Sequence, residues 1–152
     1  MSDVLQKEFG YVFLGLFSTV IANFYLVGNV SKLRRKHGIS YPATYASEEH
    51  IDGKKCKAED VVTFNCAQRA HANTCESIGM VRLAAVMNAL AGSPKLSGAL
   101  LGVYAIGRIV YGKGYVSNGP KGRLAGSIIS HLADIPLYLM LAYNGAKLLD
   151  FV

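Results

Sequence analysis

Four long hydrophobic runs, separated by short polar segments, dominate the pattern along this chain. They cover residues 11–30, 61–91, 96–116 and 124–149. Each run is long enough to cross about 30 Å of hydrocarbon, which takes ~20 residues of helix. Apolar residues lie nearly all round each predicted helix instead of forming one stripe, which is typical of membrane spans. The pattern therefore predicts an all-α, integral membrane four-helix bundle, with residues 1–152 as a single membrane domain.

The ends of the runs carry further signals. Gly92, Ser93 and Pro94 separate the second run from the third, and this combination of helix breakers predicts a tight turn. The first ten residues, MSDVLQKEFG, place no basic cluster ahead of the first run, and no small-residue cleavage site follows it. We therefore expect the first run to be retained as a helix.

Composition favours the membrane interpretation over the alternative of a soluble four-helix bundle. Hydrophobic residues make up 51% of the chain, and the mean hydropathy is +0.27. Charged residues make up 17%, which is below the ~25% usual for soluble domains. Because the four runs also have the length of membrane spans, the soluble bundle is the less favoured fold.

The distribution of lysine and arginine predicts an orientation. Basic residues gather between the first and second runs and between the third and fourth, and short loops rich in Lys and Arg stay in the cytosol. Both basic loops are therefore expected to face the cytosol, where the net charge of +6 suits anionic headgroups. The sequence has no basic module interleaved with aromatic residues, of the kind that would indicate binding to nucleic acid. The loop residues are Lys32, Arg34, Arg35, Lys36, Lys54, Lys55, Lys57, Lys113, Lys121 and Arg123, and the opposite side holds Lys7, Lys95 and Lys147.

The three cysteines predict neither disulfides nor a metal site. Cys56, Cys66 and Cys75 all fall at or near the expected cytosolic end, where thiols stay reduced. Cys66 and His71 are five residues apart, and no second pair provides a metal-ligand spacing. Cys75 is expected on the far face of its helix from Arg69, as a small packed hydrophobic residue.

Polar residues form a stripe at the start of the second run, in the segment FNCAQRAHANTCE. Arg69, Asn73 and Glu76 are spaced by four and three residues, so their side chains lie on one helix face. Ionisable groups inside a membrane are costly and indicate function. The stripe predicts a site for a polar ligand at the membrane surface.

The third run carries a second polar face with three phenols and a guanidinium. Tyr104, Arg108, Tyr111 and Tyr115 are spaced by four, three and four residues. One interpretation is an interfacial aromatic belt with an arginine that extends to the surface. The other is a pocket formed together with the second run, which the depth of Tyr104 favours.

Further polar residues lie deeper in the runs. His131, Asp134 and Tyr138 are spaced by three and four residues in the fourth run, which indicates either a polar stripe or a packed contact between helices. Arg82 lies well inside the second run. Asp134 is its candidate partner, and the alternatives are extension to the surface or contact with another subunit.

Three segments together resemble a known family. NVSKLRRKHGISYP, the specific segment FNCAQRAHANTCE, and GRIVYGKGY followed by GRLAGS are similar to the membrane-associated eicosanoid and glutathione metabolism (MAPEG) family, in a branch of microsomal glutathione transferases. The resemblance implies a homotrimer of four-helix subunits, with glutathione bound between neighbours near the cytosolic ends. It implies addition of glutathione to lipophilic electrophiles, or reduction of lipid hydroperoxides, in the endoplasmic reticulum or another intracellular membrane, with the outer mitochondrial membrane as a further option.

The resemblance also implies roles for individual residues. Arg123, ahead of a run of small residues, matches the catalytic arginine that stabilises the thiolate. Where the family has an aromatic or amide residue and a proline after the glutamate, this chain has Ser77 to Met80. The implied glutathione-binding residues are Arg34, Arg69, His71, Asn73, Glu76, Arg108, Tyr111 and Tyr115.

The chemistry of glutathione is consistent with these residues. Its two carboxylates suit the forks of Arg34 and Arg69, and its ammonium suits Glu76. A fixed cation such as Arg123 favours the thiolate. Two other classes remain as alternatives: a non-catalytic fatty-acid-binding member of the same family, of the lipoxygenase-activating type, and a small transporter or channel. A channel needs polar faces through the whole membrane thickness, whereas these cluster at one end.

Overall fold

The computed structural model describes residues 7–52 and 56–152, and the described chain is all-helical. Its four long helices correspond to the four predicted runs: the first three begin two or three residues earlier than predicted, the first and third also end about six residues later, and the second and fourth end one residue earlier. A five-residue helix between the first two was not predicted, because it is too short to carry a hydrophobic period. Lys54 and Lys55 fall outside the described residues. The helices are α1 (Phe9–Lys36), α2 (Glu48–Asp52), α3 (Ala58–Leu90), α4 (Pro94–Gly122) and α5 (Leu124–Leu148).

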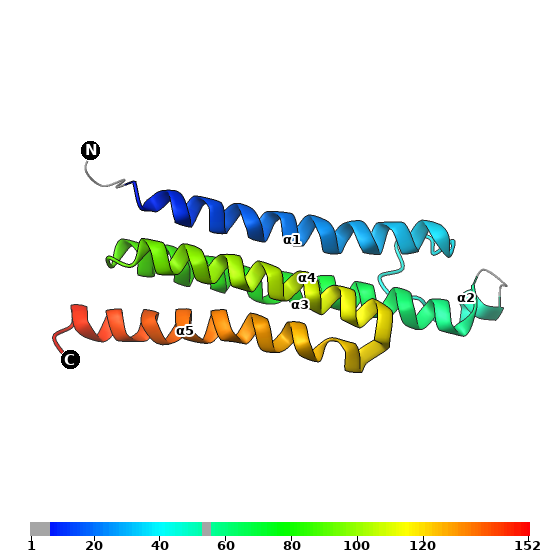
Figure 1. Cartoon of the computed structure of the whole chain (residues 1–152). Helices are drawn as coiled ribbons and strands as arrows, with labels where there is room; N and C mark the ends of the chain where they lie inside the picture. The colour runs from blue at the N-terminus through cyan, green and yellow to red at the C-terminus, as the bar shows by residue number, and fades with distance from the viewer. Residues whose placement is uncertain (1–6, 53–55) are drawn as a thin grey trace.

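The four long helices lie side by side, and the start of α1 and the end of α5 are at one end of the molecule (Figure 1). Residues 37–52 and the α4–α5 connection lie at the other end, which we name the loop end. Lys57, Lys121 and Arg123 are therefore at the loop end, whereas Lys95 and Lys147 are at the opposite end. This separation agrees with the predicted partition of basic residues.

Helices α1 and α5 are, among the described residues, those long and apolar enough to cross a membrane. Their surfaces carry large exposed apolar side chains such as Phe24 and Leu139. Helices α3 and α4 are longer but less apolar, because each carries ionisable groups along its length. Arg82, in the last third of α3, and Arg108, near the middle of α4, are examples.

Helix α4 is the centre of the molecule. It packs against α1, α3 and α5, whereas α1 and α5 lie on opposite sides of it (Figure 1). Gly126 allows α5 to approach α4 closely, because a Cβ at this position would collide with the backbone of Tyr111. Small residues at such crossings are typical of helices packed within membranes.

A kink ends the straight part of α4. Asn118 and Gly119 leave helical geometry, and Gly119 has φ +64°, a left-handed conformation that glycine adopts without strain. Pro120 follows and supplies no backbone N–H. The chain therefore turns within residues 117–123, where the sequence predicts a loop, and this turn places Arg123 at the start of α5.

Side-chain contacts fasten the segment 37–52 to the helices. Asn65 of α3 exchanges two hydrogen bonds with the backbone of Ala46, at 2.8 and 3.0 Å. His37 Nδ1 lies 3.4 Å from Asp60 Oδ1, which joins the end of α1 to the start of α3. The segment is therefore held against the loop end at both helices that it connects.

Candidate functional site

The stripe on α3 forms with the predicted spacing. Arg69 Nη1 donates to Glu76 Oε1 at 2.8 Å, two helical turns along. Both side chains remain exposed, by 45% for Arg69 and 56% for Glu76. An ion pair this exposed contributes only about 0–1 kcal/mol to stability. Both groups can therefore exchange this partner for the opposite charges of a ligand at little cost.

Arg108 joins the face of α4 to the stripe on α3. Its Nε donates to Thr74 Oγ1 and its Nη2 donates to Asn73 Oδ1, each at 2.8 Å. The guanidinium lies 4.2 Å from the centre of the Tyr111 ring, and Arg108 is buried. Two of its donors are thus already used within the protein, and the bond from Nη2 fixes the Asn73 amide in position. Sequence reasoning missed Thr74, although it directly follows Asn73.

A cavity of ≈ 630 Å³ lies between α3, α4 and α5. It brings together four of the predicted site residues, which are Asn73, Arg108, Tyr111 and Arg123. Its wall is both cationic and polar near the loop end. Seven residues that the sequence did not assign to the ligand site complete the lining: Ser77, Pro120, Lys121, Leu124, Ser127, His131 and Asp134.

Arg123 lies beside two tyrosines near the α4–α5 turn, and Tyr111 lines the cavity with it. The Arg123 guanidinium lies 5.7 Å from the centre of the Tyr115 ring, and Tyr115 meets Tyr111 edge to face at 5.6 Å. The hydrogen bond with Tyr111 raises the pKa of the Arg123 guanidinium, and the like charge of nearby Arg69 acts in the opposite direction. Arg123 is therefore a fixed positive charge at the cavity mouth.

The other two predicted residues, Arg34 and His71, lie on a different face. They line a groove of ≈ 310 Å³ between α1, α3 and residues 41–44. Arg34 is buried, and its Nη1 donates to the carbonyls of Ala43 at 2.8 Å and Ile39 at 3.3 Å. Within one chain the predicted ligand set is therefore divided between two surfaces.

Cys75 differs from its predicted environment. It lies away from the Arg69 stripe, as expected, but it is exposed and has polar neighbours instead of being packed as a hydrophobic residue. Its Sγ is 3.4 Å from His71 Nε2 and 3.7 Å from Asn23 Oδ1. The polar faces of α1 and α3 meet here, which a pattern read along one helix does not reveal.

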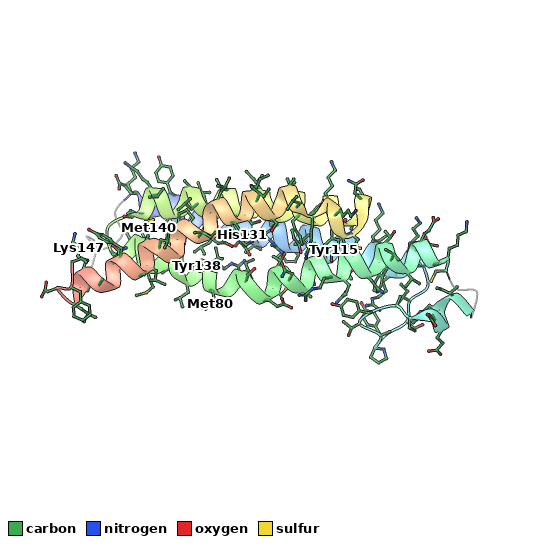
Figure 2. All side chains as sticks on the ribbon, turned by 90° about the horizontal axis from the view of Figure 1, so that it is seen from below. Met80, Tyr115, His131, Tyr138, Met140 and Lys147 are labelled. Carbon is green, nitrogen blue, oxygen red and sulfur yellow. The ribbon has the colours of Figure 1, made fainter. Side chains whose placement is uncertain are left out.

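The partners of Arg82 and Asp134 differ from the prediction. Arg82 Nε donates to Thr19 Oγ1 at 2.8 Å, whereas Asp134 is paired with His131 at 3.1 Å on its own helix. The predicted pair between Arg82 and Asp134 is therefore wrong. A hydroxyl on α1 gives Arg82 a partner within the same chain. His131 lies about two helical turns into α5, farther from the α4–α5 turn than Tyr115 (Figure 2).

A family model described as "MAPEG family" matches residues 12–143, which include most or all of each long helix. The chain belongs to the MAPEG family. Proteins of this family are bound to membranes, bind glutathione and act on lipid substrates. The family includes glutathione transferases and peroxidases as well as members without enzymatic activity. The resemblance seen in the sequence is thus confirmed for the family.

Proposed function

We propose that this MAPEG protein is a microsomal glutathione transferase, similar to the microsomal glutathione S-transferase 3 branch. It conjugates glutathione to electrophilic lipids, reduces lipid hydroperoxides with glutathione, or does both, and the activity of a leukotriene C4 synthase falls within this range. The observation that carries the proposal is the cavity of ≈ 630 Å³, with Arg123, Tyr111, Asn73 and Arg108 in its wall.

The charges around the cavity suit glutathione. At neutral pH the tripeptide carries two carboxylates and one ammonium, so its site needs cations together with an anion. Arg69 offers a guanidinium fork to a carboxylate, and Glu76 offers a carboxylate to the ammonium. Their exposed ion pair keeps both groups available until the ligand arrives. Asn73, held by Arg108, adds an amide in a fixed orientation.

Arg123 is proposed as the catalytic residue. The attacking species in either reaction is the thiolate, whose fraction at neutral pH rises when a cation lowers the thiol pKa from ~8.5. A guanidinium keeps its own proton at any physiological pH, so it supplies constant charge. Arg123 lines the cavity together with Tyr111, and its guanidinium lies 5.7 Å from the centre of the Tyr115 ring. No general base is required.

The division of the site residues between two surfaces supports a homotrimer. Arg34 and His71 line one groove, while Arg123 and Asn73 line the cavity on another side. A single glutathione contacts both sets if the groove of one subunit faces the cavity of its neighbour. We therefore propose that residues 1–152 form one membrane domain, that three copies assemble, and that each site opens to the cytosol at the loop end.

Glutathione binding to the purified protein in detergent, measured by calorimetry, tests this function. We expect saturable binding of glutathione at one site per chain. The matched tripeptide with alanine in place of cysteine keeps both carboxylates and the ammonium but lacks the thiol, so it should bind more weakly at a pH where the thiolate forms. Absence of glutathione binding together with saturable fatty-acid binding would instead identify a non-catalytic member.

A further inference from the structure

A histidine–aspartate pair lies in the same cavity as the proposed catalytic arginine. His131 Nδ1 is 3.1 Å from Asp134 Oδ1 and 3.2 Å from Oδ2, and both residues line the cavity with Arg123. Asp134 is 6% exposed, whereas the His131 side chain is 58% exposed. The carboxylate is thus fixed within the protein, and the far nitrogen of the ring, Nε2, stays open to a ligand.

The distance between this pair and Arg123 suits a ligand that lies between them. The two residues are eight positions apart on α5, which is about 12 Å along the axis at ~1.5 Å per residue. Arg123 and His131 both line the cavity. The interval between them leaves room for a sulfur atom and a short polar group.

We infer that His131, oriented by Asp134, is the proton donor to an alkoxide leaving group, and that the cavity is therefore built for lipid hydroperoxides. This inference rests on the proposed glutathione-dependent function. The Asp134 carboxylate accepts from Nδ1–H and orients the ring, so that Nε2–H of the protonated ring is the group that can be donated. Neither residue belongs to the motifs that carried the family resemblance.

The chemical step balances as follows. The glutathione thiolate beside Arg123 attacks the terminal oxygen of the hydroperoxide, so an S–O bond forms and the O–O bond breaks. The departing alkoxide takes the Nε2 proton of His131 and leaves as an alcohol. The sulfur is oxidised to a sulfenic acid and the peroxide is reduced. A second glutathione converts the sulfenic acid to the disulfide and water, and the proton released when the first thiol ionised restores the imidazolium.

Groups from three helices surround Asp134. Tyr104 and Arg108 of α4 and Tyr138 of α5 lie close enough to interact with its charge. On α3, Ser77 lines the cavity and bonds to the Tyr104 hydroxyl at 2.7 Å. The Arg108 guanidinium compensates part of the buried negative charge, and His131 supplies the rest when protonated.

Two substrates separate this role from glutathione activation. Reduction of cumene hydroperoxide expels an alkoxide that needs a proton, whereas conjugation of 1-chloro-2,4-dinitrobenzene expels chloride, which needs none. We expect His131→Gln to lower the ratio of peroxide to chloride turnover by about 10²-fold, the lower end for general acid catalysis. Asp134→Asn should lower the same ratio by a smaller factor, and Asp134→Glu should restore part of it.

Calorimetry with glutathione, run on each variant, verifies that the site is intact. If His131→Gln binds glutathione normally and keeps the wild-type ratio of peroxide to chloride turnover, the proton-donor role is overturned, whatever the activity of the enzyme. If His131→Gln does not fold, the ratio in Asp134→Asn decides, and an unchanged ratio there overturns the role. If the wild-type protein binds no glutathione, the proposed function fails and this inference fails with it.

Discussion

Replacing Arg69 by alanine should separate ligand binding from stability. In the free protein its bond is a 2.8 Å ion pair with Glu76, and both side chains are about half exposed. Such a pair contributes about 0–1 kcal/mol to stability, so the variant should unfold at nearly the same temperature as wild type. With glutathione bound, the same guanidinium holds a carboxylate by charged hydrogen bonds, each worth about 1.5–3 kcal/mol. The dissociation constant should therefore rise by roughly 10- to 150-fold, at ~1.4 kcal/mol per tenfold.

Calorimetry gives the dissociation constant and thermal unfolding in detergent gives the stability. Glu76→Gln should weaken binding over the same range, because it removes the proposed partner of the glutathione ammonium. Glu59→Gln is the matched control, since it removes an exposed carboxylate at the start of the same helix, outside the cavity between α3, α4 and α5. Equal losses in all three variants, or normal affinity in Arg69→Ala, would refute the assignment of the stripe.

Three further predictions concern the scaffold. In a cysteine-free background, single cysteines at Lys57 and Lys121 should both react with an impermeant maleimide from the cytosolic side, and reaction of either from the lumen would reverse the orientation. Arg34→Ala should lower the free energy of unfolding by at least about 3 kcal/mol, because two or more buried charged hydrogen bonds to loop carbonyls are lost. An unchanged melting temperature would contradict the buried geometry of Arg34. Gly126→Ala should force α5 away from Tyr111 and lower both stability and glutathione affinity, whereas wild-type values of both would show that the close approach is dispensable.

Hydrophobic length was sufficient to predict the four long helices, because a run of ~20 apolar residues allows few other structures. The bend at Gly119 and Pro120 also falls just after the third run, in the segment where the sequence predicts a loop. Helix α2 was missed because five residues, four of them polar, are too few to carry a hydrophobic period. The contact of Arg34 with loop carbonyls was missed for a related reason: the backbone path of an irregular segment is not written in its hydrophobic pattern.

Residues on one helix face were predicted more reliably than contacts between helices. Spacing alone placed Arg69 and Glu76 together, because the helix period fixes that relation. The bond from Arg108 to Asn73 depends on the register of α4 against α3, which the packing of many small residues decides. The same dependence explains why the pair of Arg82 and Asp134 was wrong: Thr19 comes from a helix 63 residues away in sequence.

The central claim is that Arg123 stabilises the thiolate of bound glutathione. Ultraviolet absorbance of the thiolate, followed as pH is raised with glutathione saturating, measures this directly in wild type and in Arg123→Ala. The account predicts that the wild-type complex titrates well below the ~8.5 of a free thiol, and that the variant titrates near that value with reduced turnover and a smaller change in affinity. Identical titrations and equal turnover in the two proteins would contradict it, and Arg108, in the same cavity, would become the candidate cation.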